Sequence, residues 1–445
     1  MRKISDWGNY PVIDAEVNGF DSVGQLRAQL EHPGPVIAFG NGRSYGDASL
    51  QNNILLTRRF NKFLSFDDST GILTCQSGVL FSEILEVFTP RGWFLPVTPG
   101  TKLITVGGAI AADVHGKNHH VDGSFGQHIV SLDVMRNDGS VMTCSPHENE
   151  DFFSITVGGM GLTGIILNAS FQLRKIETAY IREETIRAAN LNEIMDCFEG
   201  SNEWNYSVAW IDCLAKGESM GRSIMMRGKH AMAGELVNPS HKHAPLDPRK
   251  GMKFDVPVMF PNFALNHWTM KAFNFAYYNK CRPGTHKSIV DYNSFFYPLD
   301  AVDHWNRIYG KRGFTQYQFV IPKAAGREGM QKILKRITDS GLGSFLAVLK
   351  LFGEQDSFIS FPMGGYTLAL DFPISLRAMD LFKELDAMVA DYGGRLYLAK
   401  DSRMDAAMFE KTYPNADAFR QAIAHLNQGT TKFESLLSKR IGITS

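Results

Sequence analysis

Short apolar runs, separated by turn-forming residues, recur through the first 178 residues. Runs of this length that are rich in Val and Ile predict buried strands, because a strand needs few residues and favours β-branched side chains. We expect strands at Val36–Phe39, Ile54–Thr57, Ile72–Cys75, Ile129–Val134 and Ile165–Phe171.

Other patterns in the same region predict a helix and a turn. Apolar residues recur at helical spacing over residues 82–88, and Gly92 then stops the helix. Asn137-Asp138-Gly139 separates two strand-like runs and predicts a hairpin turn. Short strands mixed with helices predict a pair of α/β subdomains here.

After Thr178 the chain becomes richer in aromatic residues and in alternating apolar positions. Tyr317–Ile321 and Tyr366–Phe372 show this alternation, which is typical of strands in a sheet. The chain as a whole is therefore expected to be α+β, with a second, sheet-rich region that begins near residue 179.

Charge and cysteine content narrow the classes of function. The 46 basic residues balance 46 acidic residues, so no overall field attracts nucleic acid, and we expect no nucleic-acid partner. The 5 cysteines are never spaced C-x-x-C, which argues against a disulfide framework or a zinc site built from them. Because we find no signal peptide and no apolar run of transmembrane length, we expect a soluble, cytoplasmic protein.

Two glycine-rich loops carry the clearest chemical signal. Phe39–Asp47 and Val106–Ala109 both follow apolar runs, and glycine lets backbone N–H groups approach a diphosphate closely. The second loop leads into Ala109–Ala112, which we expect to start a helix with its positive end toward the anion. A glycine cluster alone is often only a turn. A Rossmann site is disfavoured because Tyr45 stands where its third glycine belongs.

A G-x-G-x-S loop followed by a V-G-G-A segment resembles the vanillyl-alcohol-oxidase superfamily of flavoproteins. Within it the chain is similar to the decaprenylphosphoryl-β-D-ribose 2′-oxidase family over nearly its whole length. The motifs that carry this resemblance are Gly42–Asp47, His115–His120, Gly123–Gly126, Thr156–Gly159 with Gly161–Ile166, Gln316–Pro322, Lys350–Gly353 and Ala399–Arg403.

The resemblance implies a PCMH-type FAD-binding domain with an inserted cap domain that contains a mixed antiparallel sheet. Residues 1–178 and 396–445 would form the FAD-binding domain, and residues 179–395 would form the substrate-binding cap. FAD would be bound without a covalent link, since Arg43 stands where linked relatives often carry a histidine. The residues implied for FAD are Phe39, Gly40, Asn41, Gly42, Arg43, Ser44, Tyr45, Gly46, Asp47, Ala48, Gly100, Thr105, Val106, Gly107, Gly108, Ala112, Asp113, Val114, His115, Ile166 and Tyr397.

The implied reaction is oxidation of the 2′-hydroxyl of a polyprenyl-phosphoryl-β-D-ribofuranose to the 2′-keto sugar, the first half of an epimerisation to arabinose for cell-envelope glycans. Its partners would be the lipid-linked sugar phosphate, an NAD(P)H-dependent short-chain reductase as second epimerase subunit, and the inner membrane through peripheral contact. The alternative is an FAD-dependent alditol or aldonolactone oxidase acting on a free sugar.

Lys400 is the first catalytic candidate, because the resemblance places its motif at the flavin ring. As a cation it would stabilise negative charge; as a neutral amine it would accept the hydroxyl proton. A base near neutral pH needs a lysine pKa about three units below its usual 10.4, so we favour the cation. His115 and Tyr45 are the alternative proton relays.

Three further residues are expected to bind substrate along with Lys400. Gln316 and Gln318 alternate on one strand and so share one face, where paired amides suit sugar hydroxyls. Lys350 interrupts an apolar strand, and a buried ammonium needs a partner such as a phosphate oxygen. Ala369 departs from the family, whose actinobacterial members carry cysteine there; hydride transfer does not need that thiol.

A histidine pair and a basic segment each allow a functional and a purely structural interpretation. His115 and His119 have the spacing of an H-x-x-x-H metal pair, but Gly116 breaks a helix between them, and we predict no metal site. The basic segment Ser240–Lys253 and the aromatic-rich residues after it read either as a solvated loop followed by core, or as a flap over residues 240–262 that contacts a lipid-linked substrate.

Overall fold

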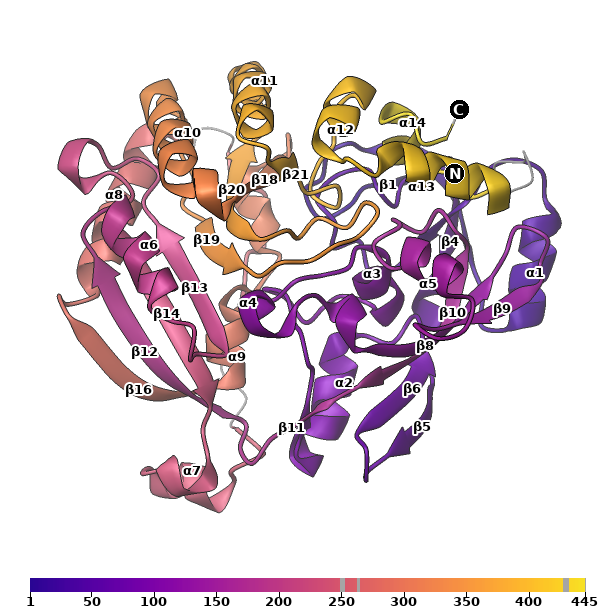
Figure 1. Ribbon diagram of the computed structural model, residues 1–445, viewed down its shortest axis with the longest axis horizontal. Helices are drawn as coiled ribbons and strands as arrows, with labels where there is room; N and C mark the ends of the chain where they lie inside the picture. The colour runs from indigo at the N-terminus through magenta and orange to yellow at the C-terminus, as the bar shows by residue number, and fades with distance from the viewer. Residues whose placement is uncertain (249–252, 262–264, 427–431, 445) are drawn as a thin grey trace.

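The computed structural model describes residues 1–248, 253–261, 265–426 and 432–444. It confirms an α+β chain in which two small sheets come from the first 172 residues and one large sheet comes from the rest. Figure 1 shows the small sheets on the right and the large sheet on the left.

The first small sheet is mixed. Its order is β1-β2-β4-β3; β1 pairs antiparallel with β2, and the other pairs are parallel. The crossing segment after β2 contains α1, which Ser22 caps by accepting from the backbone N–H of Gln25. The bounds are β1 Arg2–Ile4, β2 Ile13–Gly19, α1 Val23–Glu31, β3 Ile37–Phe39 and β4 Asn53–Leu56.

The second small sheet is antiparallel throughout, in the order β5-β6-β10-β8-β9. The predicted hairpin at Gly139 joins β8 to β9, and its φ of 76° is the left-handed conformation that such turns use. The bounds are β5 Phe63–Asp67, β6 Ile72–Gln76, β8 Ile129–Met135, β9 Val141–Cys144 and β10 Ile165–Gln172; β7 (Trp93–Phe94) pairs with β11 (Arg174–Lys175) beside it.

The large sheet has 8 strands, and every neighbouring pair is antiparallel. Its order is β16-β12-β14-β13-β19-β20-β18-β21. The bounds are β12 Tyr180–Ala188, β13 Tyr206–Ile211, β14 Ser223–His230, β16 Thr285–Asp291, β18 Phe314–Pro322, β19 Ala347–Phe352, β20 Gly365–Pro373 and β21 Arg395–Leu396.

Helices α6, α10 and α11 cover one face of the large sheet (Figure 1). Their apolar stripes pack on it, as with Ile333 and Leu334 of α10, and this leaves the opposite face to the cavity described below. The helices after α1 are α2 Phe81–Phe88, α3 Val106–Ala111, α4 His119–Asp122, α5 Glu150–Thr156, α6 Leu191–Glu199, α7 Pro239–His243, α8 His267–Lys280, α9 Tyr292–Phe296, α10 Gly326–Ser340, α11 Leu376–Asp391, α12 Ala406–Thr412, α13 Ala416–Leu426 and α14 Leu436–Arg440.

The C-terminal residues return to the first small sheet. Val36 bridges to Phe433, and Gln51 Nε2 donates to Glu434 Oε1 at 2.9 Å. Arg440 of α14 forms ion pairs with Asp47 (2.7 Å) and Asp401 (2.8 Å). The end of the chain therefore holds the first glycine loop and the Lys400 segment against each other.

All five strands predicted in the first region are confirmed to within a residue or two. The second glycine loop differs from the prediction, because the helix begins at Val106 rather than at Ala109. Thr105 caps it by accepting from the N–H of Gly108, so both loop glycines lie in the first turn. The helix contains 6 residues.

Candidate functional site

A cavity of about 560 Å³ lies between the glycine loops and the free face of the large sheet. Its size is that of a cofactor or substrate site. One wall consists of backbone-rich segments, including Gly40–Tyr45 and Thr98–Thr101. The opposite wall consists of side chains from β13, β14, β18, β19 and β20.

The glycine wall has the form of a cofactor cradle. A Cβ on Gly40 would lie 2.4 Å from Thr105 Oγ1, and one on Gly107 would lie 2.9 Å from Ser77 Cβ, so both positions need glycine. At Gly100 a Cβ would meet no protein atom within 4 Å and would project into open space. These features fit FAD, whose length needs a groove lined by backbone N–H groups.

Most of the residues expected to bind FAD line this cavity, and five do not. Phe39 and Val106 are packed in the core, and Gly46 approaches the backbone of Asp401. The Asp47 carboxylate is held by Arg440. Those that line it are Gly40, Asn41, Gly42, Arg43, Ser44, Tyr45, Ala48, Gly100, Thr105, Gly107, Gly108, Ala112, Val114, His115, Ile166 and Tyr397.

Asp113 is the fifth residue away from the cavity. Its Oδ1 accepts the N–H of Gly126 at 2.9 Å, and its Oδ2 accepts from Gln355 (2.8 Å) and Ser360 (2.5 Å). The carboxylate therefore ties the second glycine loop to the loop between β19 and β20.

The sheet wall is divided into a polar and an apolar part. Gln316, Gln318, Lys350 and Thr367 form the polar part, which lies next to Lys400 and His115. The apolar part is formed by Val208, Trp210, Met226, Leu346 and Val348. The wall thus suits a ligand with a polar head and an apolar extension.

Lys400 lies between the two walls, in the segment that follows β21. Its Nζ lies 3.8 Å from the centre of the Tyr45 ring. Burial lowers the pKa of Lys400 to about 7, although Asp371 and Asp6 oppose that shift. The sequence alone favoured a charged Lys400, because it gave no cause for so low a pKa; burial in the fold is that cause.

His115 is held by a side chain of the cap. Gln318 Nε2 donates to His115 Nε2 at 3.0 Å, which occupies the lone pair that would otherwise accept a proton. Burial, together with Lys350, holds the pKa of His115 well below its usual range. Burial also raises the pKa of Tyr45 well above its usual value. Neither group is suited to accept a proton near neutral pH.

Two lysines add positive charge to the polar part of the wall. Burial lowers the pKa of Lys350 to about 8, and among the described residues its ammonium has no hydrogen-bond or ion-pair partner. Lys117 donates to the backbone oxygen of Phe295, and burial and Lys350 lower its pKa to about 7. An anion beside these lysines would favour the charged form of both.

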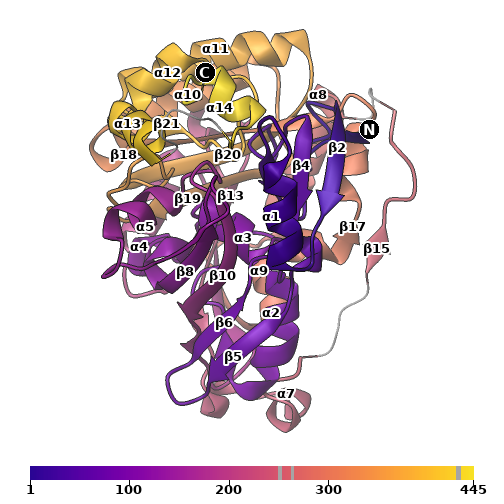
Figure 2. The same ribbon diagram turned by 90° about the vertical axis from the view of Figure 1, so that its right-hand side faces the viewer.

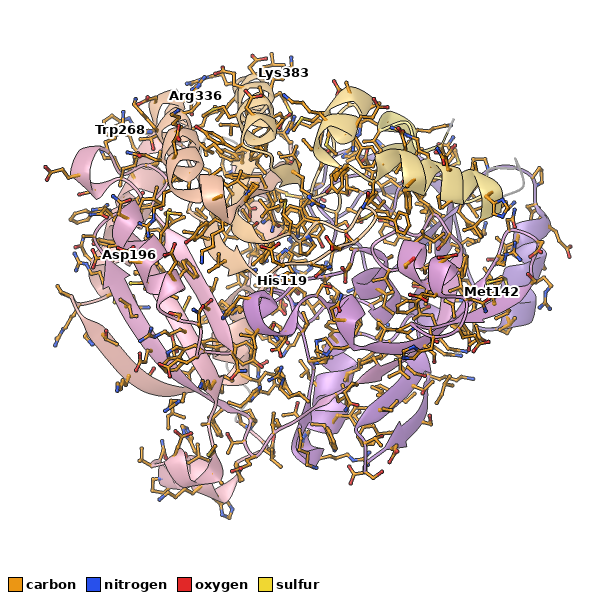
Figure 3. All side chains as sticks on the ribbon, in the orientation of Figure 1. His119, Met142, Asp196, Trp268, Arg336 and Lys383 are labelled. Carbon is orange, nitrogen blue, oxygen red and sulfur yellow. The ribbon has the colours of Figure 1, made fainter. Side chains whose placement is uncertain are left out.

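His119 lies at the junction of the two halves of the molecule (Figure 3). Its Nε2 bonds with Gln355 Oε1 at 2.9 Å, and its Nδ1 accepts the N–H of Gly353 at 3.2 Å. Both ring nitrogens are therefore used for packing between the halves. This accounts for the histidine without a metal.

Several residues of the site were not found from the sequence. Lys117 belongs to the His115–His120 motif, but nothing in the sequence showed that its side chain would line the cavity. Trp7 reaches the cavity from the N-terminal segment and packs under Arg43, whose guanidinium lies 4.1 Å from the ring centre. Asp6 and Asp371 are buried, and burial raises the pKa of each to about 7.

The two described parts of the segment expected as a flap, residues 240–262, pack against different parts of the molecule. Helix α7 packs at the far end of the cap, where His241 stacks on Tyr180 at 4.2 Å (Figure 2). By contrast, β15 (Phe254–Asp255) pairs with β17 (Val302–Asp303), which lines the cavity. Only the second part therefore lies at the cavity, while residues 249–252 and 262 fall outside the described residues.

Comparison with known proteins identifies the family of this chain. The FAD binding domain family model matches residues 24–145, which include both glycine loops. The decaprenylphosphoryl-beta-D-ribose oxidase of Mycolicibacterium smegmatis is 39% identical over 405 residues, 88% of this chain and 86% of that protein. The chain belongs to the decaprenylphosphoryl-β-D-ribose oxidase family. It is an FAD-dependent oxidoreductase, as the sequence predicted.

Other relatives are less similar to this chain. An uncharacterized Streptomyces coelicolor protein is 29% identical over 82% of this chain and 100% of its own length. The L-gulono-1,4-lactone dehydrogenase of Mycobacterium tuberculosis is 22% identical over 92% of this chain and 90% of its own. The free-sugar alternative thus corresponds to a distant branch. Among the described residues, no helix is long and apolar enough to cross a membrane.

Proposed function

We propose that the protein oxidises the 2′-hydroxyl of a polyprenyl-phosphoryl-β-D-ribofuranose to the 2′-keto sugar. The observation that carries this proposal is the divided cavity wall. Lys350, Gln316 and Gln318 form a cationic and amide-lined part beside the flavin cradle, and Trp210 and Val348 belong to an apolar part next to it. A sugar phosphate with a lipid tail matches both parts, whereas a free alditol leaves the apolar part without a ligand.

FAD supplies the acceptor for the hydride that leaves the carbinol carbon. Arg43 cannot form the covalent link that histidine forms in some relatives, and His115 Nε2 is held by Gln318, so we propose non-covalent binding. The backbone of the two glycine loops would hold the diphosphate, and Tyr397, whose hydroxyl donates to the Ala112 oxygen at 3.0 Å, would border the flavin ring.

Lys400 is the proposed proton acceptor. With a pKa of about 7, a substantial fraction of its amine is neutral at physiological pH, and the neutral amine can take the hydroxyl proton as hydride leaves. After the transfer, the new ammonium lies over the Tyr45 ring, where the π face stabilises a cation. His115 and Gln318 would orient the sugar.

Lys350 and Lys117 would bind the substrate phosphate. Burial lowers the pKa of both lysines, and a phosphate between them would favour the charged form of each. The keto product requires reduction on the opposite face to complete an epimerisation. We therefore propose an NAD(P)H-dependent short-chain reductase as partner, working at the cytoplasmic side of the inner membrane.

The segment at residues 253–260 supports a peripheral membrane contact. Phe254 is 61% exposed, Val258 63% and Met259 41%, and Lys253 lies beside them. Because this segment pairs with a strand that lines the cavity, it would meet the bilayer where the substrate lipid enters. A Phe254→Ser/Val258→Ser variant should bind anionic phospholipid vesicles less than the wild type does; equal binding would contradict the contact.

Anaerobic mixing tests the reaction. Polyprenyl-phosphoryl-ribose should bleach the bound flavin, and free ribose, alditols and aldonolactones should do so far more slowly. Bleaching by an alditol or lactone with none by the lipid-linked sugar would instead assign the protein to the free-sugar oxidases.

A further inference from the structure

The two glutamine amides of the cavity wall have the same orientation: each uses its NH₂ group for hydrogen bonds within the protein. Gln316 Nε2 donates to Asp371 Oδ1 at 2.6 Å. Gln318 Nε2 donates to His115 Nε2 at 3.0 Å and to Thr367 Oγ1 at 3.3 Å. Within the described part of the chain, neither amide oxygen has a hydrogen-bond partner. Neither oxygen is fully buried, and both residues line the cavity. The wall therefore presents two acceptors.

Asp371 determines the orientation of Gln316. It lies directly opposite Gln316 in the pairing of β18 with β20 and is 1% exposed. Its backbone N–H donates to Ser344 Oγ at 3.0 Å, which fixes the position of the residue. Burial raises the pKa of Asp371, but the hydrogen bond from Gln316 favours its ionised form. The ionised carboxylate can only accept hydrogen bonds, so it holds the NH₂ end of the amide and leaves Oε1 for a ligand.

We propose that Asp371 is a positioning residue that locks Gln316 as an acceptor, so that Gln316 and Gln318 together select a sugar with two free hydroxyl donors. This inference rests on the proposed function. The two donors are the 3′ and 5′ hydroxyls, because the 2′-hydroxyl gives up its proton in the reaction. A site built to pair with hydroxyls rejects analogues that lack them, since its buried acceptor is then left unpaired.

The test compares flavin bleaching by the lipid-linked ribose with bleaching by its 3′-fluoro and 5′-fluoro analogues, because fluorine keeps the size of a hydroxyl but cannot donate. For the wild type, each analogue should be slower in kcat/KM by about 10-fold or more. In Asp371→Asn, the new amide can accept or donate, so Gln316 can turn its NH₂ to the cavity. One analogue should then recover to within about threefold of the parent, while the one that Gln318 selects stays slow.

The kcat/KM of each analogue is compared with that of the parent sugar within one variant at one pH. A change of charge near Lys400 affects both values and therefore cancels in their ratio. Tyr309→Phe is the matched control: the Tyr309 hydroxyl contacts the same carboxylate at 3.5 Å but not the amide, so both penalties should remain. Gln316→Leu serves if Asp371→Asn fails to fold, and it too should remove one penalty only.

Two results would overturn the inference: both penalties retained in Asp371→Asn or Gln316→Leu, or neither present in the wild type. If the lipid-linked ribose does not reduce the wild-type flavin, the proposed function fails instead. The same ratios, measured with fluoro analogues of whichever polyol does reduce it, then decide the role of Asp371.

Discussion

Lys400 shows how its surroundings change the chemistry of a residue. An exposed lysine is a cation at neutral pH, but Lys400 lies between the walls of the cavity, and burial brings its pKa to about 7. Asp401, its neighbour in the sequence, does not oppose this, because its carboxylate is held by Arg440. The carboxylates that act on Lys400 are Asp371 and Asp6, which come from distant parts of the chain.

The pH dependence of flavin reduction follows from this pKa. The neutral amine is the active form, so the rate should fall as the pH drops below about 7 and should level off above it. If Lys400 acted as a cation, the rate would instead fall as the pH rises. Stopped-flow flavin bleaching, measured at pH values on both sides of about 7, shows whether the rate falls toward acid or toward alkaline pH.

Replacement of Lys400 by Met should slow flavin reduction by on the order of 10²-fold or more, because a general base acts only in the transition state. FAD affinity should change little, since the glycine loops bind the cofactor. The variant should also lose the acidic limb of the pH profile. A Lys400→Met enzyme that reduces its flavin at the wild-type rate would remove Lys400 from the mechanism.

The sequence could indicate some site residues but not their contacts. Lys400, Gln318 and Lys350 lie in recognisable motifs, and each lines the cavity. The bond from Gln318 to His115 joins residues 203 positions apart, so no local pattern announces it. Asp6 lies in an ordinary N-terminal segment and becomes significant only when the fold buries it.

At the scale of elements, local patterns predicted strands well and loop geometry less well. In the five predicted strands of the first region, the length and the β-branched content of the local sequence are enough to specify a strand. The start of α3 was predicted three residues too late, because Thr105 caps the helix and offsets the low helix propensity of Gly107 and Gly108.

The glycine loops permit a test of the cofactor cradle itself. In Gly100→Ala the new Cβ meets no protein atom within 4 Å, so the apo-protein should unfold at an unchanged temperature while FAD binds more weakly. In Gly40→Ala the Cβ collides with Thr105 Oγ1, so stability and FAD affinity should both fall. Thermal unfolding with and without FAD measures both. Unchanged FAD affinity in Gly100→Ala would place the cofactor elsewhere.

At the scale of the whole molecule, the cavity depends on segments that are far apart in the sequence. The first glycine loop, the face of the large sheet and the Lys400 segment meet there, and Arg440 near the C-terminus joins Asp47 to Asp401. Resemblance to a family could predict this assembly. Hydrophobic patterns could not, because they carry no information on which elements meet.

Arg440→Met should lower the free energy of unfolding by about 3 kcal/mol, because it leaves two buried carboxylates without their cation. FAD retention should fall with it, since Asp47 is the last residue of the first glycine loop. Arg336→Met is the control, because Arg336 pairs with the exposed side chain of Glu384 and should matter far less. Urea unfolding of both variants measures the difference; equal losses would show that the Arg440 pairs are not special.

In the proposed reaction, hydride leaves C2′ of a lipid-linked ribose. The most direct measurement is anaerobic flavin bleaching with polyprenyl-phosphoryl-ribose that carries deuterium at C2′ or at C3′. Cleavage of the C2′–H bond predicts slower bleaching with deuterium at C2′ and an unchanged rate with deuterium at C3′. A slower rate with the C3′ label alone, or no bleaching by either substrate, would contradict the account.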